Sequence, residues 1–398
     1  MVSFLSLVVV AVSAFAWVEV RAVDRSTSTA SLIASGSGDA TAEQNILLVG
    51  VDSRTDTQGN PLPPALLDAL HAGDSSDGGD TADTLIVVHV PAGGGRATAI
   101  SVPRDSYVQL AGTYGRHKIN SAYSRAAQST RDALTGAAGG GAGTSAAMFA
   151  PETLPRAATP DDPAVQRAAA AAGARETIQS VEGLTGLPIT HYAAVNLAGF
   201  ADLSQAIGGV PVCLRAPVDD SYSGLVLGAG PQEVSGTQAL AFVRQRHGLP
   251  NGDLDRIARQ QVFLASATRQ LLSAGTLANP FAINRLSGVV SRSVTLDAGW
   301  NVLGFAQQLQ GLSAGAVTFR TIPTGDTELP TPSDGDAVAV NPLQVRAFIG
   351  AAIADDAGRT QAAPTTTAAP APTTPAPAPA APSPVAAPIT AASPGCVN

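Results

Sequence analysis

The chain has 398 residues, a formal net charge of −8 and 45% hydrophobic residues, so its length allows two or three average domains. The acidic balance argues against nucleic acid as a main partner. There are two cysteines, Cys213 and Cys396. Two cysteines this far apart are too few for a disulfide framework or a structural zinc cluster.

The N-terminus carries an apolar stretch, "FLSLVVVAVSAFAWV" at 4–18, without a charged residue. It is shorter than the roughly 20 residues that usually cross a bilayer. We expect residues 1–22 to be a single-pass signal-anchor, with the rest of the chain outside the cytoplasm. A cleaved signal peptide is the alternative, because "AFA" at 14–16 resembles a cleavage site. Arg21 and Arg25 follow the stretch, which is unusual for this orientation.

Residues 23–42 are expected to be a linker, and residues 43–355 one α/β domain. Apolar runs bounded by polar residues predict strands at 45–51, 84–90, 97–102 and 316–323. Helical patterns are found at 164–184, 198–207, 253–273 and 342–353. Two segments rich in glycine and small or polar residues, about 53–82 and 132–163, are predicted as long loop insertions.

The end of the chain differs in composition. Residues 361–398 contain alanine, proline, threonine and serine with no charged side chain, including ten prolines. Such a segment cannot form a packed core. We therefore predict a disordered tail over residues 356–398.

The stretch "FVRQRHGLPNGDLDRIARQQ" at 242–261 concentrates arginine in a chain that has a single lysine, Lys118. Its arginines are Arg244, Arg246, Arg256 and Arg259, and Gln260 follows the last of them. If 242–246 is extended, its two arginines point to one face. On the following helix, the other three follow i, i+3, i+4 spacing and lie together, opposite an apolar stripe. The pattern predicts an anion site; the alternative is a solvated charged surface.

Carboxylates are predicted at the same edge. Asp52 ends the first strand, Asp83 directly precedes the second, and Arg104 follows the third. In an antiparallel arrangement these three positions lie side by side. Two close carboxylates repel, and Mg²⁺ commonly binds one or two carboxylates together with phosphate oxygens and water. Each aspartate taken alone could instead be a turn or cap residue. Lys118 and Asn120 could add phosphate contacts.

In order along the chain, these motifs resemble the LytR–CpsA–Psr family of cell-envelope proteins, in its actinobacterial form. The matching pieces are "NILLVGVDSR", "ADTLIVVHV", "SVPRDSYV", "HKINSAY", "LTGLPITHYAAVNLAGFADLSQAIGGVPVCL", "GTQALAFVRQRH" and "GDLDRIARQQVF", which cover about 45–265.

The resemblance implies a three-layer α/β/α sandwich around a mixed sheet. It implies a phosphotransferase that moves a phosphoglycan from a polyprenyl-pyrophosphate carrier to a peptidoglycan hydroxyl. By motif position, Asp52 and Asp83 would hold Mg²⁺. The phosphate-gripping residues would be Arg104, Arg244, Arg246, Arg256 and Gln260, with Lys118 and Asn120 as further substrate contacts. The catalytic residues would be Asp52, Asp83, Arg104 and Arg256. A hydrolase that splits the pyrophosphate and a non-enzymatic lipid-phosphate-binding regulator are the alternatives.

The chain departs from the family pattern at two positions. Thr81 stands where the family usually has an arginine two residues before the second aspartate. Arg54 or Arg116 could supply the missing charge. Family members often pair the cysteine of "VCL" with one near position 231, where this chain has Pro231. Because this partner is absent and the other cysteine, Cys396, lies in the predicted disordered tail, we expect Cys213 to be a free, largely buried thiol.

Overall fold

The computed structural model describes residues 28–30, 32–33, 42–73, 79–92, 95–136, 159–272, 288–290, 293–298, 300, 317–361 and 388–398. The predicted N-terminal anchor, most of the linker, part of the second insertion and residues 362–387 of the predicted tail lie outside this set. Among the residues described, no helix is both long and apolar enough to span a bilayer.

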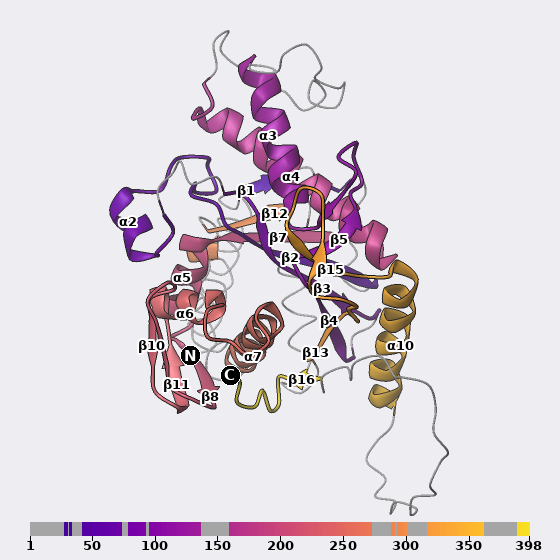
Figure 1. Ribbon diagram of the computed structural model, residues 1–398. Helices are drawn as coiled ribbons and strands as arrows, with labels where there is room; N and C mark the ends of the chain where they lie inside the picture. Colours follow the sequence, from indigo (N-terminus) through magenta and orange to yellow (C-terminus); the bar gives the residue numbers. More distant parts are fainter. Residues whose placement is uncertain are drawn as a thin grey trace, which may run out of the picture.

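An eight-stranded mixed sheet forms the centre of the molecule (Figure 1). Its strands, in spatial order, are β1 (Ser28–Ala30), β12 (Val294–Asp297), β7 (His191–Asn196), β2 (Gln44–Val51), β3 (Ala82–Val90), β4 (Ala97–Val102), β13 (Val317–Thr321) and β16 (Ile389–Thr390). The pairs β1–β12, β2–β7 and β4–β13 are parallel and the others antiparallel. The predicted antiparallel order of the first three strands is confirmed.

Helices cover both faces of the sheet. One face packs against α3 (Ser121–Thr135), α4 (Pro163–Thr185) and α10 (Pro342–Gln361). The other carries α5 (Leu197–Ala206), α6 (Gly236–Arg244) and α7 (Asp253–Leu272), as Figure 1 shows. The predicted α/β/α arrangement around a mixed sheet is thus what the described residues form.

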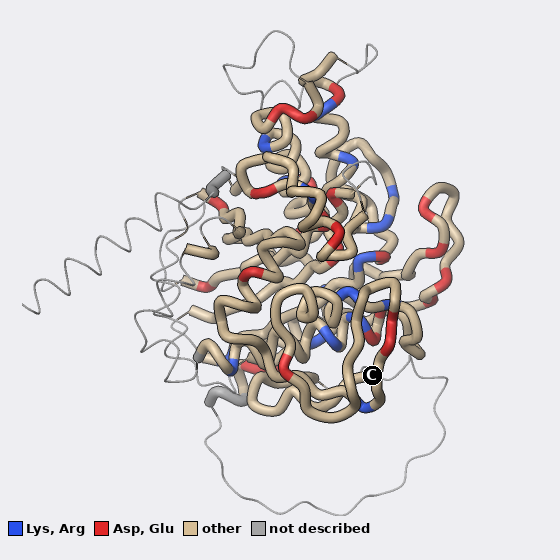
Figure 2. The backbone as a smooth tube through the Cα atoms, turned by 90° about the vertical axis from the view of Figure 1, so that its left-hand side faces the viewer, with Lys and Arg blue, Asp and Glu red and all other residues tan. Residues whose placement is uncertain are grey.

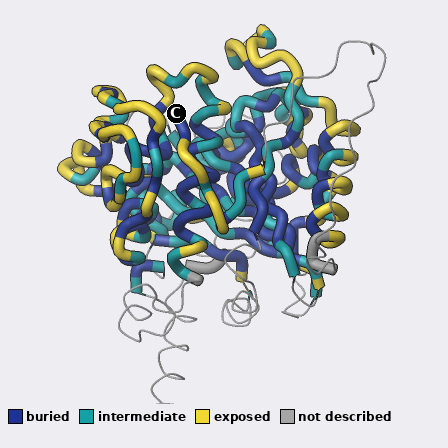
Figure 3. Tube along the Cα trace, turned by 90° about the horizontal axis from the view of Figure 1, so that it is seen from below, coloured by how far each residue is buried: buried dark blue, intermediate teal, exposed yellow. Residues whose placement is uncertain are grey.

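The apolar runs of the central strands follow from burial on both faces. Leu47 and Val49 of β2 belong to the core beneath α3 and α4. Ile46, whose side chain points to the opposite face, belongs to a separate core that includes Ala265 of α7. Figure 3 shows buried segments in the interior and exposed ones at the outer turns of the helices. Neither face needs alternating polar residues, which is why the strands read as continuous apolar segments.

Helix ends follow capping rules where the sequence offers them. The side chain of Asp162 accepts a hydrogen bond from the amide of Ala164, and Pro163 begins α4. Gly186 ends the helix with φ of 74°, a left-handed conformation that favours glycine. These local signals explain why the predicted range, 164–184, lies within one residue of the observed helix at each end.

Three smaller sheets surround the central one. They pair β8 (Val210–Leu214) with β11 (Gly230–Val234), β9 (Val218–Asp220) with β10 (Leu225–Leu227), and β5 (Ser106–Gln109) with β6 (Arg116–Lys118), β15 (Asp336–Ala339) and β14 (Leu329–Pro330). The first predicted insertion, 53–82, contains the short helix α2 (Pro64–Ala69). Leu67 and Leu70 in this insertion are buried in the same core as α5 and α6, so part of it is packed structure.

The predictions for the tail and for Cys213 need correction. Residues 356–361 continue α10, and residues 389–390 add β16 to the sheet edge. Cys213 of β8 forms a disulfide with Cys396, so the free-thiol prediction is wrong. Next to it, the amide of Val397 donates to the carbonyl of Cys213 at 2.9 Å. The composition of the tail predicted disorder, but backbone pairing with β8 and β13 holds residues 389–397, which include Cys396, on the domain.

Candidate functional site

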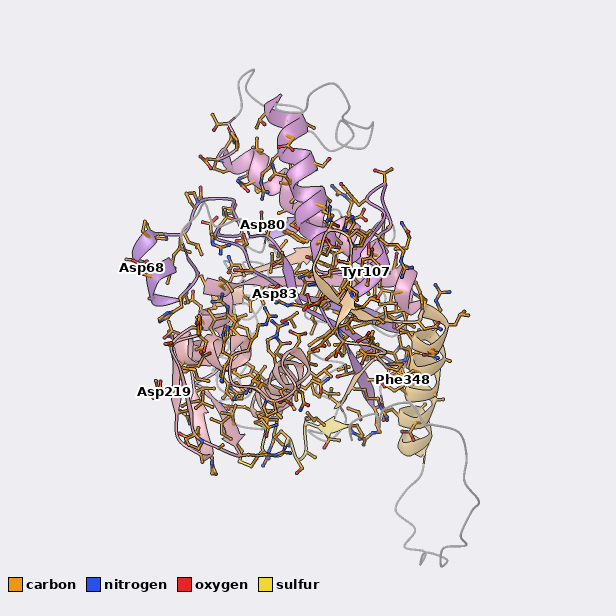
Figure 4. All side chains as sticks on the ribbon, viewed as in Figure 1. Asp68, Asp80, Asp83, Tyr107, Asp219 and Phe348 are labelled. Carbon is orange, nitrogen blue, oxygen red and sulfur yellow. A yellow bond between two sulfur atoms is a disulfide. The ribbon has the colours of Figure 1, made fainter. Side chains whose placement is uncertain are left out.

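Asp52 and Asp83 lie side by side where two inner strands of the central sheet end: Asp52 directly follows β2, and Asp83 is near the start of β3. Below, this side of the sheet is called the edge. A bulge follows Gly50 of β2, and the amide of Asp52 then donates to the carbonyl of Thr81 at 2.9 Å. Asp83 is the second residue of β3, which begins two residues earlier than predicted. The side chain of Arg104, which follows β4, reaches Asp83 with 2.8 Å between Nη1 and Oδ2. Figure 4 shows Asp83 near the middle of the molecule.

The two carboxylates differ in electrostatic environment. Burial raises the pKa of Asp52 above its ordinary value, and the charge of Asp83 adds to this effect. Burial acts in the same direction on Asp83, but Arg104 and Arg256 outweigh it and lower the pKa of Asp83. Oδ1 of Asp52 is buried and accepts no hydrogen bond from the described residues. Asp52 is therefore the carboxylate at this edge whose charge is less fully balanced.

Arg256 of α7 is close enough to Asp83 for its charge to lower the pKa of that carboxyl group, and its side chain is 3% exposed. Its Nη2 is 2.5 Å from Oδ1 of Asp253, one helical turn earlier. The same oxygen lies 3.7 Å from Nε of Arg104, so one carboxylate serves two guanidinium groups. Burial lowers the pKa of Arg256 to about 10, which still leaves it cationic at neutral pH. Figure 2 shows basic and acidic positions close together at several places along the backbone.

A cavity of about 400 Å³ opens beside these groups, between the sheet and α5, α6 and α7. Its walls are mostly apolar and include Ile86, Phe200, Phe263 and Leu271. The charged and amide side chains that line it are Asp52, Asp83, Asn196, Arg244, Arg256 and Gln260. The cavity therefore combines an apolar space with a cluster of acidic and basic side chains, an arrangement that suits an amphipathic ligand.

The arginines of the 242–261 stretch do not all converge as predicted. Residues 242–244 end helix α6, so the expected extended segment is absent there. Arg244 lines the cavity and donates to the carbonyl of Leu70 at 3.0 Å, whereas Arg246 is exposed. Arg259 is fully buried away from the cavity, where Nε donates to the carbonyl of Asn398. The helical spacing of Arg256 and Gln260 is confirmed as a shared surface; Arg259 is not part of it.

Lys118 and Asn120 do not line the cavity; they contact Asp105 and Arg104. Nζ of Lys118 is 3.4 Å from Asp105, which is itself 3.7 Å from Arg104. The backbone of Asn120 links two parts of the edge, because its amide donates to Arg104 and its carbonyl accepts from Ala82. These residues therefore support Arg104.

The sequence left open whether Arg54 or Arg116 supplies the positive charge that Thr81 lacks. Arg54 is held by two hydrogen bonds, from Nε and Nη2 to the carbonyl of Ala72, and its Nη1 lies 3.9 Å from Oδ1 of Asp52. Thr81 donates its hydroxyl to Asp83 at 3.0 Å. Arg116, the other candidate, is exposed and lies over the ring of Tyr107. By position, Arg54 is the guanidinium that accompanies Asp52.

The comparisons with known proteins agree with this architecture. The model of the LytR_cpsA_psr family matches residues 16–340, which is most of the chain. The chain belongs to the LytR–CpsA–Psr family. The resemblance drawn from the sequence motifs is thereby confirmed.

Among curated relatives, the cell wall biosynthesis protein LcpA of Corynebacterium glutamicum is 39% identical over 89% of this chain and 65% of its own length. The polyisoprenyl-teichoic acid–peptidoglycan teichoic acid transferase TagU of Enterococcus faecalis is 26% identical over 50% of this chain and 49% of its own length. The chain thus spans less than two thirds of these relatives. The solved LytR-Csp2A-Psr enzyme from Actinomyces oris has the same fold, with a TM-score of 0.53 at 19% identity, over 82% of this chain and 95% of that one.

Proposed function

We propose that this protein transfers a phosphoglycan from a polyprenyl-pyrophosphate carrier to peptidoglycan, forming a phosphodiester in cell-wall assembly. The observation that carries the proposal is the apolar cavity of about 400 Å³ with aspartates and arginines along one side. A prenyl chain requires an apolar space, and a pyrophosphate requires cations. The names of the relatives, a cell wall biosynthesis protein and a peptidoglycan transferase, support the same class of reaction.

The arginines would bind the pyrophosphate. Arg244 and Arg256 line the cavity, and Nε of Arg256 is buried with no hydrogen-bond partner among the described residues. A buried guanidinium with an unused donor suits an anionic oxygen. Gln260, one turn after Arg256, would contribute an amide donor from the same surface. Arg104 would keep Asp83 in place and add positive charge, with Lys118 and Asn120 supporting it.

We assign Mg²⁺ to Asp52 and Asp83. No group of three or more histidine, cysteine, aspartate or glutamate side chains suited to a metal ion occurs in the described part of the chain. A metal with all-protein ligands is therefore not what these residues fit. They fit an ion that takes two carboxylates and completes its shell with phosphate oxygens and water. The buried Oδ1 of Asp52, which lacks a hydrogen bond, supports this assignment. When bound, Mg²⁺ would neutralise negative charge on the pyrophosphate.

The reaction would then need few specialised groups. The oxygen of an acceptor hydroxyl attacks the phosphorus that carries the glycan, and the bond from this phosphorus to the bridging oxygen breaks. Polyprenyl phosphate leaves with the electron pair, and the hydroxyl proton passes to water. Arg244 and Arg256 stabilise the charge that develops on the bridging oxygen. Their fixed positions also hold the reacting groups in line.

The substrates place the domain at the outer surface of the cell membrane. The apolar stretch at 4–18 would tether the domain there. A lipid carrier bound in the membrane could then enter the cavity without leaving its own environment. This part of the proposal depends on the sequence, because the stretch lies outside the described residues.

The test is to purify the full chain from a membrane fraction and examine it by mass spectrometry for a retained prenyl phosphate. The purified protein is then given a polyprenyl-pyrophosphate-linked sugar and Mg²⁺, with and without peptidoglycan. A phosphodiester-linked sugar on peptidoglycan is expected. Free sugar phosphate in equal amounts under both conditions would indicate hydrolysis instead. Lipid binding without turnover would indicate a non-enzymatic role.

A further inference from the structure

Outside the cavity, one exposed aromatic side chain is held in a fixed position. Tyr222 is 72% exposed, at the tip of the hairpin between β9 and β10. Its ring stacks on that of His247, with centroids 3.9 Å apart and planes 24° from parallel. A tyrosine so exposed contributes little to the core, yet its ring is restrained by a second ring. The pair offers a flat, partly apolar surface to the solvent.

Both rings stand on loops that buried side chains hold. Asp220, 6% exposed, accepts hydrogen bonds from the amide of Tyr222 at 3.1 Å and the hydroxyl of Ser223 at 2.7 Å. Gln245, 4% exposed, donates from Nε2 to the carbonyl of His247 at 2.9 Å. Each ring is therefore positioned before any ligand arrives, which lowers the entropy cost of binding.

The pair lies next to the arginines of the cavity. Arg246 directly precedes His247 in the chain. The pKa of Arg256 is lowered mainly by the burial of Arg256 itself, and the positive charge of Arg246 adds to this effect, so the two guanidinium groups are near each other. Arg244, which lines the cavity, donates to the carbonyl of His71 at 3.3 Å.

The hairpin approaches that same residue. At Gly224, φ is +72°, and a Cβ there would lie 2.6 Å from Nε2 of His71. Figure 4 labels Asp219 on β9 and Asp68 on α2, the two elements that flank this contact. The end of α2, the hairpin tip and the turn at 245–247 thus meet around Arg244.

We propose that Tyr222 and His247, together with Arg246, form a subsite for the sugar that is attached to the pyrophosphate of the donor. The inference rests on the proposed function, which places the pyrophosphate at Arg244 and Arg256. A sugar joined to that phosphate must lie within a few bonds of these arginines, on the side away from the prenyl cavity. Arg246 and His247 follow Arg244 within three residues and are exposed, and Tyr222 stacks on His247.

The chemistry of the pair fits a sugar ring. A pyranose has a face of C–H groups that packs on an aromatic ring, and hydroxyl groups at its edge. The imidazole of His247 and the guanidinium of Arg246 can exchange hydrogen bonds with those hydroxyls. A prenyl chain would be better placed in the cavity, where the walls are apolar on several sides.

The experiment compares two ligands, geranylgeranyl pyrophosphate and the same lipid pyrophosphate carrying one N-acetylhexosamine. Dissociation constants are measured by calorimetry with the full chain, in wild type, Tyr222→Ala and Tyr222→Phe. The matched control is Val226→Ala, which changes a side chain that is 66% exposed in the same hairpin. Thermal unfolding of each variant checks that the fold is intact.

In wild type we expect the sugar-bearing lipid to bind more tightly than the bare lipid. Tyr222→Ala should reduce that preference by about two- to tenfold, the range expected for loss of one aromatic contact. Tyr222→Phe and Val226→Ala should keep the preference. An unchanged preference in Tyr222→Ala, or an equal loss for both lipids, would overturn the subsite and leave the proposed function standing. If wild type bound neither lipid, the proposed function would fail and the subsite with it.

Discussion

Replacing Arg256 by lysine tests the anion site most directly, because the change keeps a positive charge and removes the planar guanidinium. The native side chain is 3% exposed and its Nη2 lies 2.5 Å from Asp253. Lysine cannot keep this contact and also present a second donor in the same plane. Loss of a hydrogen bond to a charged group costs about 1.5–3 kcal/mol. That corresponds to about 10- to 150-fold weaker binding of a lipid pyrophosphate.

Burial adds a dependence on pH. It lowers the pKa of Arg256 to about 10, and lysine begins from a pKa about 2 lower than arginine. The same burial would therefore bring lysine closer to neutral pH, and its positive charge would be lost as pH rises. The deficit of Arg256→Lys should be larger at pH 9 than at pH 7.

The assay is calorimetric titration with geranylgeranyl pyrophosphate at both pH values. Arg269→Lys is the matched control, because Arg269 is exposed in the last turn of the same helix and its replacement should not affect binding. The reasoning would be refuted if Arg256→Lys bound the ligand as tightly as wild type at both pH values.

Other substitutions test the metal assignment, the role of Arg54 and the disulfide. Replacing Asp52 or Asp83 by alanine should lower Mg²⁺-dependent release of polyprenyl phosphate by at least about tenfold, a barrier increase of about 1.4 kcal/mol; unchanged metal-dependent turnover in both variants would remove the metal assignment. Thr81→Arg should leave turnover unchanged or lower it, because Arg54 already stands 3.9 Å from Asp52, while Arg54→Ala should lower it severely; a clear gain with Thr81→Arg would show that the site lacks a charge. Cys213→Ser should lower the free energy of unfolding by about 2–5 kcal/mol, because it opens a cross-link between positions 183 residues apart. An unfolding temperature equal to that of wild type under non-reducing conditions would contradict this last expectation.

Several features of the fold were predictable because they depend on local chemistry. The apolar run of β2 belongs to a strand buried on both faces, and its pattern does not depend on which strands are its neighbours. Helix α4 begins after Asp162 and ends at Gly186, both of which are local capping signals. The pair Arg256 and Gln260 also follows from local geometry, because helical spacing by itself places them on one surface.

Other features depended on what surrounds a segment. Arg244 is the last residue of α6, although the short stretch around it could equally have been extended. Ala241, Phe242 and Val243 are all buried in the core with α5 and α7, and this packing favours the helix. Arg259 has the right spacing to join Arg256, but the C-terminal segment and the ring of Phe242 hold it elsewhere. Periodicity identifies a surface of a helix and does not say what will cover it.

The sequence by itself determined the α/β class and the strand ends that carry Asp52 and Asp83, because both depend on apolar periodicity or on residues close together in the chain. The three-layer arrangement followed from the family resemblance of the motifs. Only the tertiary structure decided which arginines reach the cavity and that Cys213 pairs with Cys396. The physical reason is distance along the chain. Cys396 meets Cys213 where the C-terminal segment pairs with β13 and Val397 hydrogen-bonds to Cys213, and no local pattern encodes these contacts between positions 183 residues apart.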